Sequence, residues 1–198
     1  MQTIYAKDKN IEYIDTQAKV YTGDTQIVLP VVPLAGTPIN IILFDSFGQM
    51  KLIQDTAKEA VKHFTKPDYI VCPEAKSIPV AQEMARLWDI DYFVLRKSKK
   101  LYMQDPKSID TKSITTLATQ QLWYDASTIH VLQNKNIMIF DDVISSGGTI
   151  ASVLAFAKDC SLCISSIASI FLEGHSPYVA DLKASYTLEH LGFLPIIE

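Results

Sequence analysis

Residues 137–149 constrain the fold more than any other stretch of the chain. The four apolar residues 137–140 predict a short buried strand. Two carboxylates, Asp141 and Asp142, follow it, and a loop of small and hydroxyl-bearing residues then leads into a helical pattern over 150–158. In an open α/β sheet, ligands bind beyond the carboxyl ends of the strands, and the N-terminus of a helix binds anions. The stretch therefore predicts an α/β fold with an anion site at this loop.

The residue types in this stretch fit a particular ligand. The small loop residues let backbone N–H groups approach a phosphate, and the serine and threonine hydroxyls add donors. The two adjacent carboxylates can accept hydrogen bonds from a diol, so phosphate and diol together describe a ribose 5-phosphate. The alternative interpretation is an ordinary strand-to-helix turn whose acidic residues cap the helix.

Predicted strands and helices alternate along most of the chain. The pattern predicts strands over 20–22, 26–32, 39–44, 69–72, 92–95, 121–124, 137–140, 164–171 and 186–188, and helices over 49–64, 78–88 and 150–158. Such alternation is typical of a parallel sheet with helices on both faces. Each stretch that suggests a ligand site follows directly after a predicted strand.

Residues 137–149 resemble the phosphoribosyl pyrophosphate (PRPP) signature of type I phosphoribosyltransferases. The resemblance implies one domain over 1–198, with a five-stranded parallel sheet and a small hood from residues 1–45 and 175–198. It implies that Asp141 and Asp142 are catalytic and hold the ribose hydroxyls. It also implies that Val143 and Ile144 contact PRPP, and that the 5′-phosphate is surrounded by Ser145, Ser146, Gly147, Gly148 and Thr149.

Two more stretches resemble the adenine and xanthine members of this family. Residues 72–77 resemble their pyrophosphate loop, which holds a non-proline cis peptide, here expected between Glu74 and Ala75 or, as second choice, between Ala75 and Lys76. Residues 96–101 are similar to the basic loop of the adenine enzymes. The alternatives are a helix start with an acid in its first turn and a solvated basic loop. The PRPP contacts implied here are Glu74, Ala75, Lys76, Ser77, Arg96, Lys100 and Tyr102.

A long polar stretch, residues 106–119, predicts a flexible lid that excludes water from the reaction. The alternative is a plain disordered excursion. We expect that Trp123 or Tyr124, which come just after it, covers the base by stacking. Because Ser145 stands where hypoxanthine-guanine enzymes carry an aspartate, we expect adenine or xanthine to be a better substrate than hypoxanthine or guanine.

The expected activity is transfer of a 5-phosphoribosyl group from PRPP to a purine base, an enzymatic step of purine salvage. Mg²⁺ is the implied cofactor, bound near Asp141 and Asp142 through PRPP and water rather than directly by the protein. The basic loop with Arg96 and Lys100 implies a homodimer, because in the family it reaches a two-fold partner. The alternatives are a PRPP-binding regulatory protein without turnover and an unrelated phosphoryl-transfer switch built on the two aspartates.

The composition of the chain argues against several other classes of protein. With 18 basic and 22 acidic residues the net charge is −4, which argues weakly against nucleic-acid binding. No run of about 20 apolar residues predicts a membrane span, and residues 1–10 lack the apolar core of a signal peptide, so we expect a cytoplasmic protein. The cysteines and histidines show no metal-ligand spacing.

Overall fold

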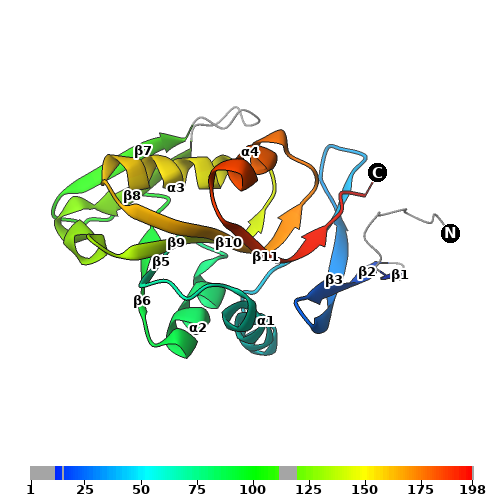
Figure 1. The fold of residues 1–198 in the computed structure, drawn as a ribbon. Helices are drawn as coiled ribbons and strands as arrows, with labels where there is room; N and C mark the ends of the chain where they lie inside the picture. Colours follow the sequence, from blue (N-terminus) through cyan, green and yellow to red (C-terminus); the bar gives the residue numbers. More distant parts are fainter. Residues whose placement is uncertain (1–11, 15, 112–119, 198) are drawn as a thin grey trace.

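The computed structural model of the chain describes residues 12–14, 16–111 and 120–197, and a five-stranded parallel sheet lies at its centre (Figure 1). The order of its strands is β11 (Leu188–Leu194), β10 (Cys163–Glu173), β9 (Asn136–Ile144), β5 (Tyr69–Pro73) and β6 (Asp91–Leu95). Every neighbouring pair of strands in it is parallel. The predicted α/β class and the five-stranded sheet are confirmed.

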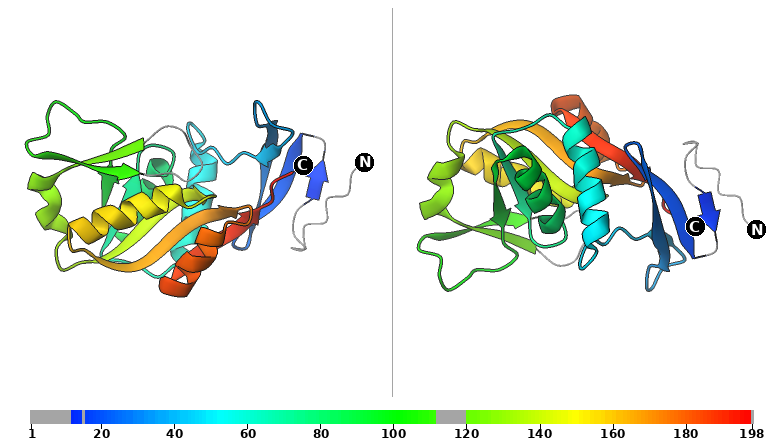
Figure 2. Two further views of the ribbon diagram at one scale, coloured as in Figure 1. Left: turned by 90° about the horizontal axis from the view of Figure 1, so that it is seen from above. Right: turned by 90° about the horizontal axis from the view of Figure 1, so that it is seen from below.

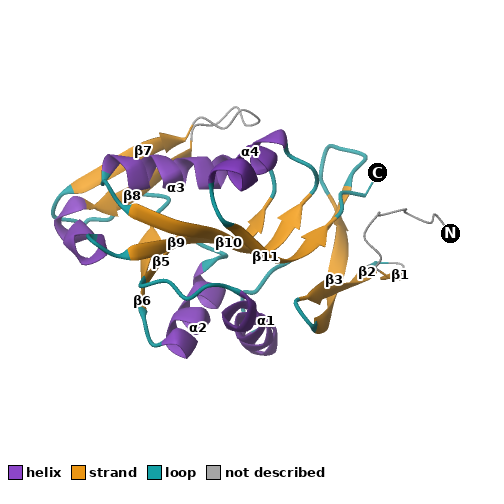
Figure 3. Ribbon diagram, in the orientation of Figure 1, coloured by secondary structure: helices purple, strands orange, loops and turns teal. Residues whose placement is uncertain are grey.

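Four helices cover the two faces of the sheet (Figures 1 and 3). Helices α1 (Met50–His63) and α2 (Ile78–Trp88) lie on one face, and α3 (Gly148–Asp159) and α4 (Pro177–Ser185) lie on the other. The central strand β9 serves both layers, since Met138 and Phe140 belong to one apolar core and Ile137 and Ile139 to the other. This burial on both faces explains why β9 reads as a continuous apolar run.

A smaller antiparallel sheet forms the hood beside the main sheet (Figure 2). Its strands are β1 (Glu12–Ile14), β2 (Gln17–Thr22), β3 (Thr25–Pro33) and β4 (Asn40–Ile42). Ile197 from the C-terminal segment pairs with it, through hydrogen bonds between Asn40 N and Ile197 O at 2.7 Å and between Ile197 N and Asn40 O at 3.0 Å. The Leu191 carbonyl of β11 also accepts the Gly23 N–H from the turn between β2 and β3, at 3.2 Å. Within 175–198, which we expected to contribute to the hood, α4 covers the main sheet and β11 belongs to it. The strand predicted over 186–188 overlaps β11 only at Leu188, because Tyr186 is still the C-cap of α4.

Part of residues 106–119, which were predicted to form an irregular lid, is a β-strand in the structure. Residues Pro106–Thr111 form strand β7, which pairs antiparallel with β8 (Gln120–Asp125). The reason is that β8 buries alternate residues, Leu122 and Tyr124, in the core beneath α3, and a strand of this kind needs a hydrogen-bonding partner. The 3₁₀ helix η1 (Ala126–Leu132) follows it. The rest of the predicted lid, 112–119, lies outside the described residues.

The remaining predicted helices and strands are confirmed within a few residues. Across the described ranges, no helix combines the length and the apolar character that crossing a membrane requires.

Candidate active site

The three stretches singled out from the sequence meet at one edge of the main sheet. Residues 74–77 follow β5, residues 96–102 follow β6, and residues 145–149 follow β9. Because these strands are parallel, their carboxyl ends share an edge, which is where open α/β sheets bind ligands.

The sequence analysis placed Asp141 and Asp142 just after the strand. In the structure, both acids lie inside β9. The pairing of β9 with β10 continues past them, from Asp141 with Ser169 to Ile144 with Leu172. On the other side, the pairing of β9 with β5 ends at Ile139. The two acids thus stand where β5 and β9 stop being paired, between the loop after β5 and the loop after β9.

The carboxyl groups of both acids are buried, with Asp141 9% and Asp142 8% exposed. Burial raises the pKa of Asp141 well above its usual range, and the neighbouring charge of Asp142 raises it further. Burial likewise raises the pKa of Asp142. The Asp142 N–H donates to Asp141 Oδ1 at 3.1 Å, which satisfies one oxygen. Two buried carboxylates of this kind are stabilised by bound hydroxyl donors or by a cation.

The loop that follows β9 is shaped for an anion. Gly147 precedes the first turn of α3 with φ +83°, a conformation that favours glycine, and no side chain caps the helix. The loop residues 145–149 and the acid Asp141 line a cavity of about 90 Å³ at this helix start. Uncapped N–H groups together with the helix dipole attract a phosphate there.

The loop after β5 contains a cis peptide bond between Glu74 and Ala75, as predicted. The Glu74 carboxylate accepts the Lys97 N–H at 2.8 Å and lies 3.5 Å from Arg96, so it ties the loop after β5 to the loop after β6. Ser77 was expected to contact PRPP, but it is 1% exposed and its hydroxyl donates to the Pro73 carbonyl at 2.5 Å. Only its backbone remains for a ligand.

Lys76 is held by two residues that the sequence analysis missed. Its Nζ lies 3.9 Å from Asp45 Oδ2, and its carbonyl accepts the Ser46 hydroxyl at 3.2 Å. Both partners belong to the connection between β4 and α1. Their signal was available, because polar residues follow the predicted strand 39–44 directly.

The loop after β6 is basic and exposed. Lys100 Nζ donates to Ser98 Oγ at 2.9 Å, and Tyr102 is 69% exposed. Arg96 remains next to the sheet, because its N–H and carbonyl pair with the backbone of Trp123 at 2.8 and 2.7 Å. The backbone of Arg96 is therefore fixed to the neighbouring strand, whereas Lys100 belongs to the exposed part of the loop.

The prediction that Tyr124 stacks on the base is wrong for this structure. Its ring is 3% exposed and packs edge-on against Phe156, with ring centres 4.9 Å apart, and its hydroxyl donates to Asp159 at 2.9 Å. Side chains alternate along a strand, so Trp123 faces the other way and is half-buried. Trp123 is the more exposed of the two candidates.

Another functional candidate, Glu173, was not recognised from the sequence. It ends β10, and burial raises the pKa of its carboxyl group, while the nearby Ser145 side chain lowers it. The signal was the same as for the aspartates, a carboxylate at the carboxyl end of a predicted strand.

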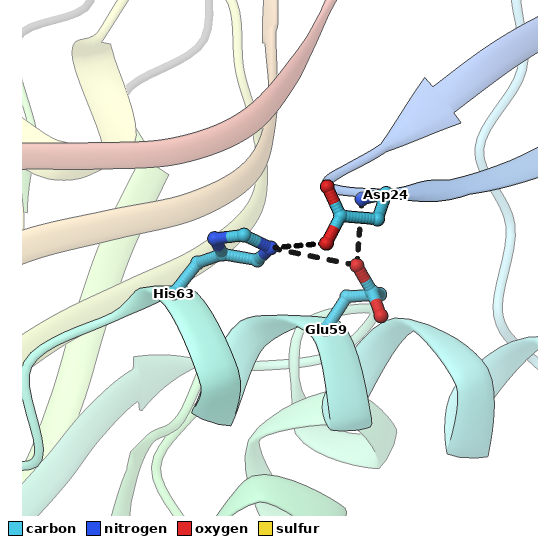
Figure 4. A group of neighbouring side chains, drawn as sticks. All are labelled: Asp24, Glu59 and His63. Atoms are coloured by element: carbon cyan, nitrogen blue, oxygen red, sulfur yellow. Dashed lines mark hydrogen bonds and ion pairs between the residues drawn. The ribbon is translucent and has the colours of Figure 1, made fainter.

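A cluster of possible metal ligands lies elsewhere, among the described residues, where Asp24, Glu59 and His63 approach one another (Figure 4). Asp24 comes from the turn between β2 and β3 and already pairs with Lys62, while Glu59 and His63 belong to the last turns of α1. That end of α1 leads into the start of β5, the edge of the sheet opposite to the phosphate loop. The cluster connects the hood to the core and does not serve this site.

Known proteins with similar sequences and folds agree on a family. The sequence family described as phosphoribosyl transferase domain matches residues 44–190 of this chain. A hypoxanthine/guanine phosphoribosyltransferase of Methanocaldococcus sp. is 26% identical over 151 residues, which cover 75% of this chain and 73% of the relative. The adenine phosphoribosyltransferase of Thermoanaerobacter pseudethanolicus has a similar fold, with a TM-score of 0.69 at 19% identity over 82% of this chain and 94% of the other.

A second structural relative is the adenine phosphoribosyl transferase of Trypanosoma brucei, solved in complex with AMP, pyrophosphate and ribose-5-phosphate. Its TM-score is 0.61 at 15% identity, over 88% of this chain and 76% of the other. The strand order, the acid pair and the phosphate loop thus agree with the domain match. The chain belongs to the phosphoribosyl transferase domain family, and it is a phosphoribosyltransferase of the type I fold.

Proposed function

We propose that the protein transfers the 5-phosphoribosyl group of PRPP to a purine base and releases pyrophosphate. The observation that carries the proposal is the buried acid pair of β9 directly beside the uncapped start of α3. Asp141 and Asp142 accept the ribose hydroxyls, and residues 145–149 hold the 5′-phosphate. Both families of relatives support a purine acceptor, since their names are those of hypoxanthine/guanine and adenine enzymes.

The residues at this edge divide the work on PRPP. The backbone of residues 74–77, with Lys76, faces the pyrophosphate from β5, and Arg96 and Lys100 approach it from β6. Positive charge develops on the ribose as the bond to pyrophosphate breaks, and the two fixed carboxylates stabilise it electrostatically. The chain needs no covalent intermediate for this displacement.

The site also fits Mg²⁺. Burial raises the pKa of both Asp141 and Asp142, and hard cations prefer such carboxylate oxygens as ligands. Asp141 and Asp142 would hold the ion through PRPP and water. When bound, it neutralises the charge of the leaving pyrophosphate.

We also propose a homodimer. The loop after β6 exposes the apolar side chain of Leu101 completely and Tyr102 to 69%, which is unusual for residues without a partner surface. Light scattering at micromolar concentration is expected to give the mass of two chains, and a monomer would contradict this.

The choice of base remains a prediction. The relatives in sequence are hypoxanthine/guanine enzymes, whereas the relatives in fold are adenine enzymes. Ser145 carries no acid, which still favours adenine or xanthine. Equal or faster turnover of hypoxanthine or guanine would refute this preference.

Pyrophosphate release from PRPP and Mg²⁺ with adenine, xanthine, hypoxanthine and guanine in turn tests the activity. We expect release with at least one purine and none without a base. Calorimetry with PRPP accompanies it, because PRPP binding without turnover of any purine would favour a regulatory protein instead. Failure to bind PRPP would refute both functions.

A further inference from the structure

The segment that joins β10 to α4 contacts the phosphate loop from outside. Ser176 Oγ donates to the carbonyl oxygen of Ser146 at 3.1 Å. The Ser145 side chain also lies near Glu173 at the end of β10, where it opposes the rise that burial causes in the pKa of Glu173. The hydrogen bond from Ser176 thus ties the loop to a segment that is anchored between a strand and a helix of the core.

Tyr178 extends this contact to the next residue of the loop. A Cβ added at Gly147 would lie 2.3 Å from Cδ1 of the Tyr178 ring, so the ring is packed directly against the glycine backbone. Ser176 and Tyr178 therefore contact two successive residues of the loop, 146 and 147.

The hydrogen bond of Ser176 is unusual for its position. Ser176 is the N-cap of α4, where a serine hydroxyl normally accepts a hydrogen bond from the first turn of its own helix. Here it makes no such bond, and its hydroxyl donates to Ser146 instead. The side chain thus serves the phosphate loop rather than the helix that it begins.

This hydrogen bond sets the direction of a phosphate donor. The carbonyl of Ser146 and the N–H of Gly147 belong to one planar peptide unit and point in opposite directions. Since the carbonyl is held toward Ser176, the Gly147 N–H points away from the Ser176 hydroxyl, and Gly147 itself lines the cavity of the loop.

We propose that Ser176 is a positioning residue for the phosphate loop, which holds the Ser146 carbonyl and thereby directs the Gly147 N–H at the 5′-phosphate. The inference rests on the proposed function for the identity of the anion. It predicts that Ser176 affects the 5′-phosphate and not the pyrophosphate, because the loop after β5 has no contact with this segment among the described hydrogen bonds.

Calorimetric titration of the full chain with ribose 5-phosphate, and separately with inorganic pyrophosphate, tests the inference. For Ser176→Ala we expect ribose 5-phosphate affinity to fall about three- to tenfold, the effect of one hydrogen bond, and pyrophosphate affinity to stay within about twofold. In turnover, KM for PRPP rises while kcat changes little. Ser176→Thr keeps the hydroxyl and is expected to restore wild-type affinity.

Ser165→Ala is the matched control. The Ser165 hydroxyl also donates to a backbone carbonyl at 3.1 Å, that of Ile137, but near the opposite end of β10. We expect no change in affinity for either ligand. Unchanged ribose 5-phosphate affinity in Ser176→Ala, or an equal loss for both ligands, would overturn the inference. A wild-type protein that does not bind ribose 5-phosphate would instead refute the proposed function, and the inference with it.

Discussion

The phosphate loop and the β7–β8 hairpin both border the candidate site, but they are built in opposite ways. Residues 145–149 are consecutive, and their conformation follows from glycine, small side chains and the start of α3. The hairpin is defined by partners far away in sequence, since Tyr124 packs on Phe156 and bonds Asp159. Local chemistry determines most of the first region, to which Ser176 and Tyr178 add contacts from α4, whereas tertiary packing determines the second.

The largest expected effect comes from the acid pair beside the phosphate loop. Replacing Asp141 and Asp142 together by asparagine removes two charged acceptors, each worth about 1.5–3 kcal/mol. We expect PRPP affinity to fall at least about 100-fold in calorimetry. The free energy of unfolding should not decrease, because burial already disfavours both charges in the free protein. A folded double variant with wild-type affinity would show that this region does not bind the ribose.

The second largest effect is expected from a change in the backbone of the phosphate loop, at Gly147. In Gly147→Ala, the positive φ costs about 1–2 kcal/mol, and the new Cβ lies 2.3 Å from Tyr178. We expect about a tenfold or greater loss of ribose 5-phosphate affinity. Gly36→Ala is the control, since Gly36 has a similar φ of +79° with no atom within 4 Å. It should lose stability without losing affinity, and an equal loss of affinity in both variants would contradict the prediction.

In the hairpin, Asp125 predicts a dependence on pH. Its carboxylate accepts hydrogen bonds from the N–H groups of Asp105, Gln104 and Ser127, which lower its pKa to about 2. A folded-state pKa below the usual 3.8 stabilises the fold fully above pH 4, and this contribution is lost as the pH falls toward 2. Thermal melting should show Asp125→Asn below wild type at pH 7, with the difference shrinking below pH 3. A constant difference would exclude the charge as its cause.

The smallest effect is expected for the hydroxyl of Tyr124. Tyr124→Phe removes its hydrogen bond to Asp159, worth about 0.5–1.5 kcal/mol, so Tm should fall by a few degrees. The KM for the purine should stay within about twofold, because the ring is buried. A large rise in that KM would restore the stacking role that the structure contradicts. Trp123→Ala, measured in parallel, tests the remaining candidate.

The sequence predicted most of the main sheet and the order of its ligand loops, because apolar runs and glycine-rich turns act locally. It also predicted the cis bond after Glu74, through resemblance to the family. It failed for Tyr124, whose burial depends on residues distant in the chain. It also missed Ser176, since a serine before Pro177 reads as an ordinary helix cap.

The backbone pairing between Arg96 and Trp123 joins the hairpin to the loop after β6. Two hydrogen bonds, at 2.8 and 2.7 Å, connect the open end of the hairpin to the edge strand β6. Under the proposed function, a displacement of β8 would move Arg96 as well and change its contact with the leaving pyrophosphate. In kinetic terms, we expect pyrophosphate departure and hairpin opening to be one event, with a single relaxation rate rather than two.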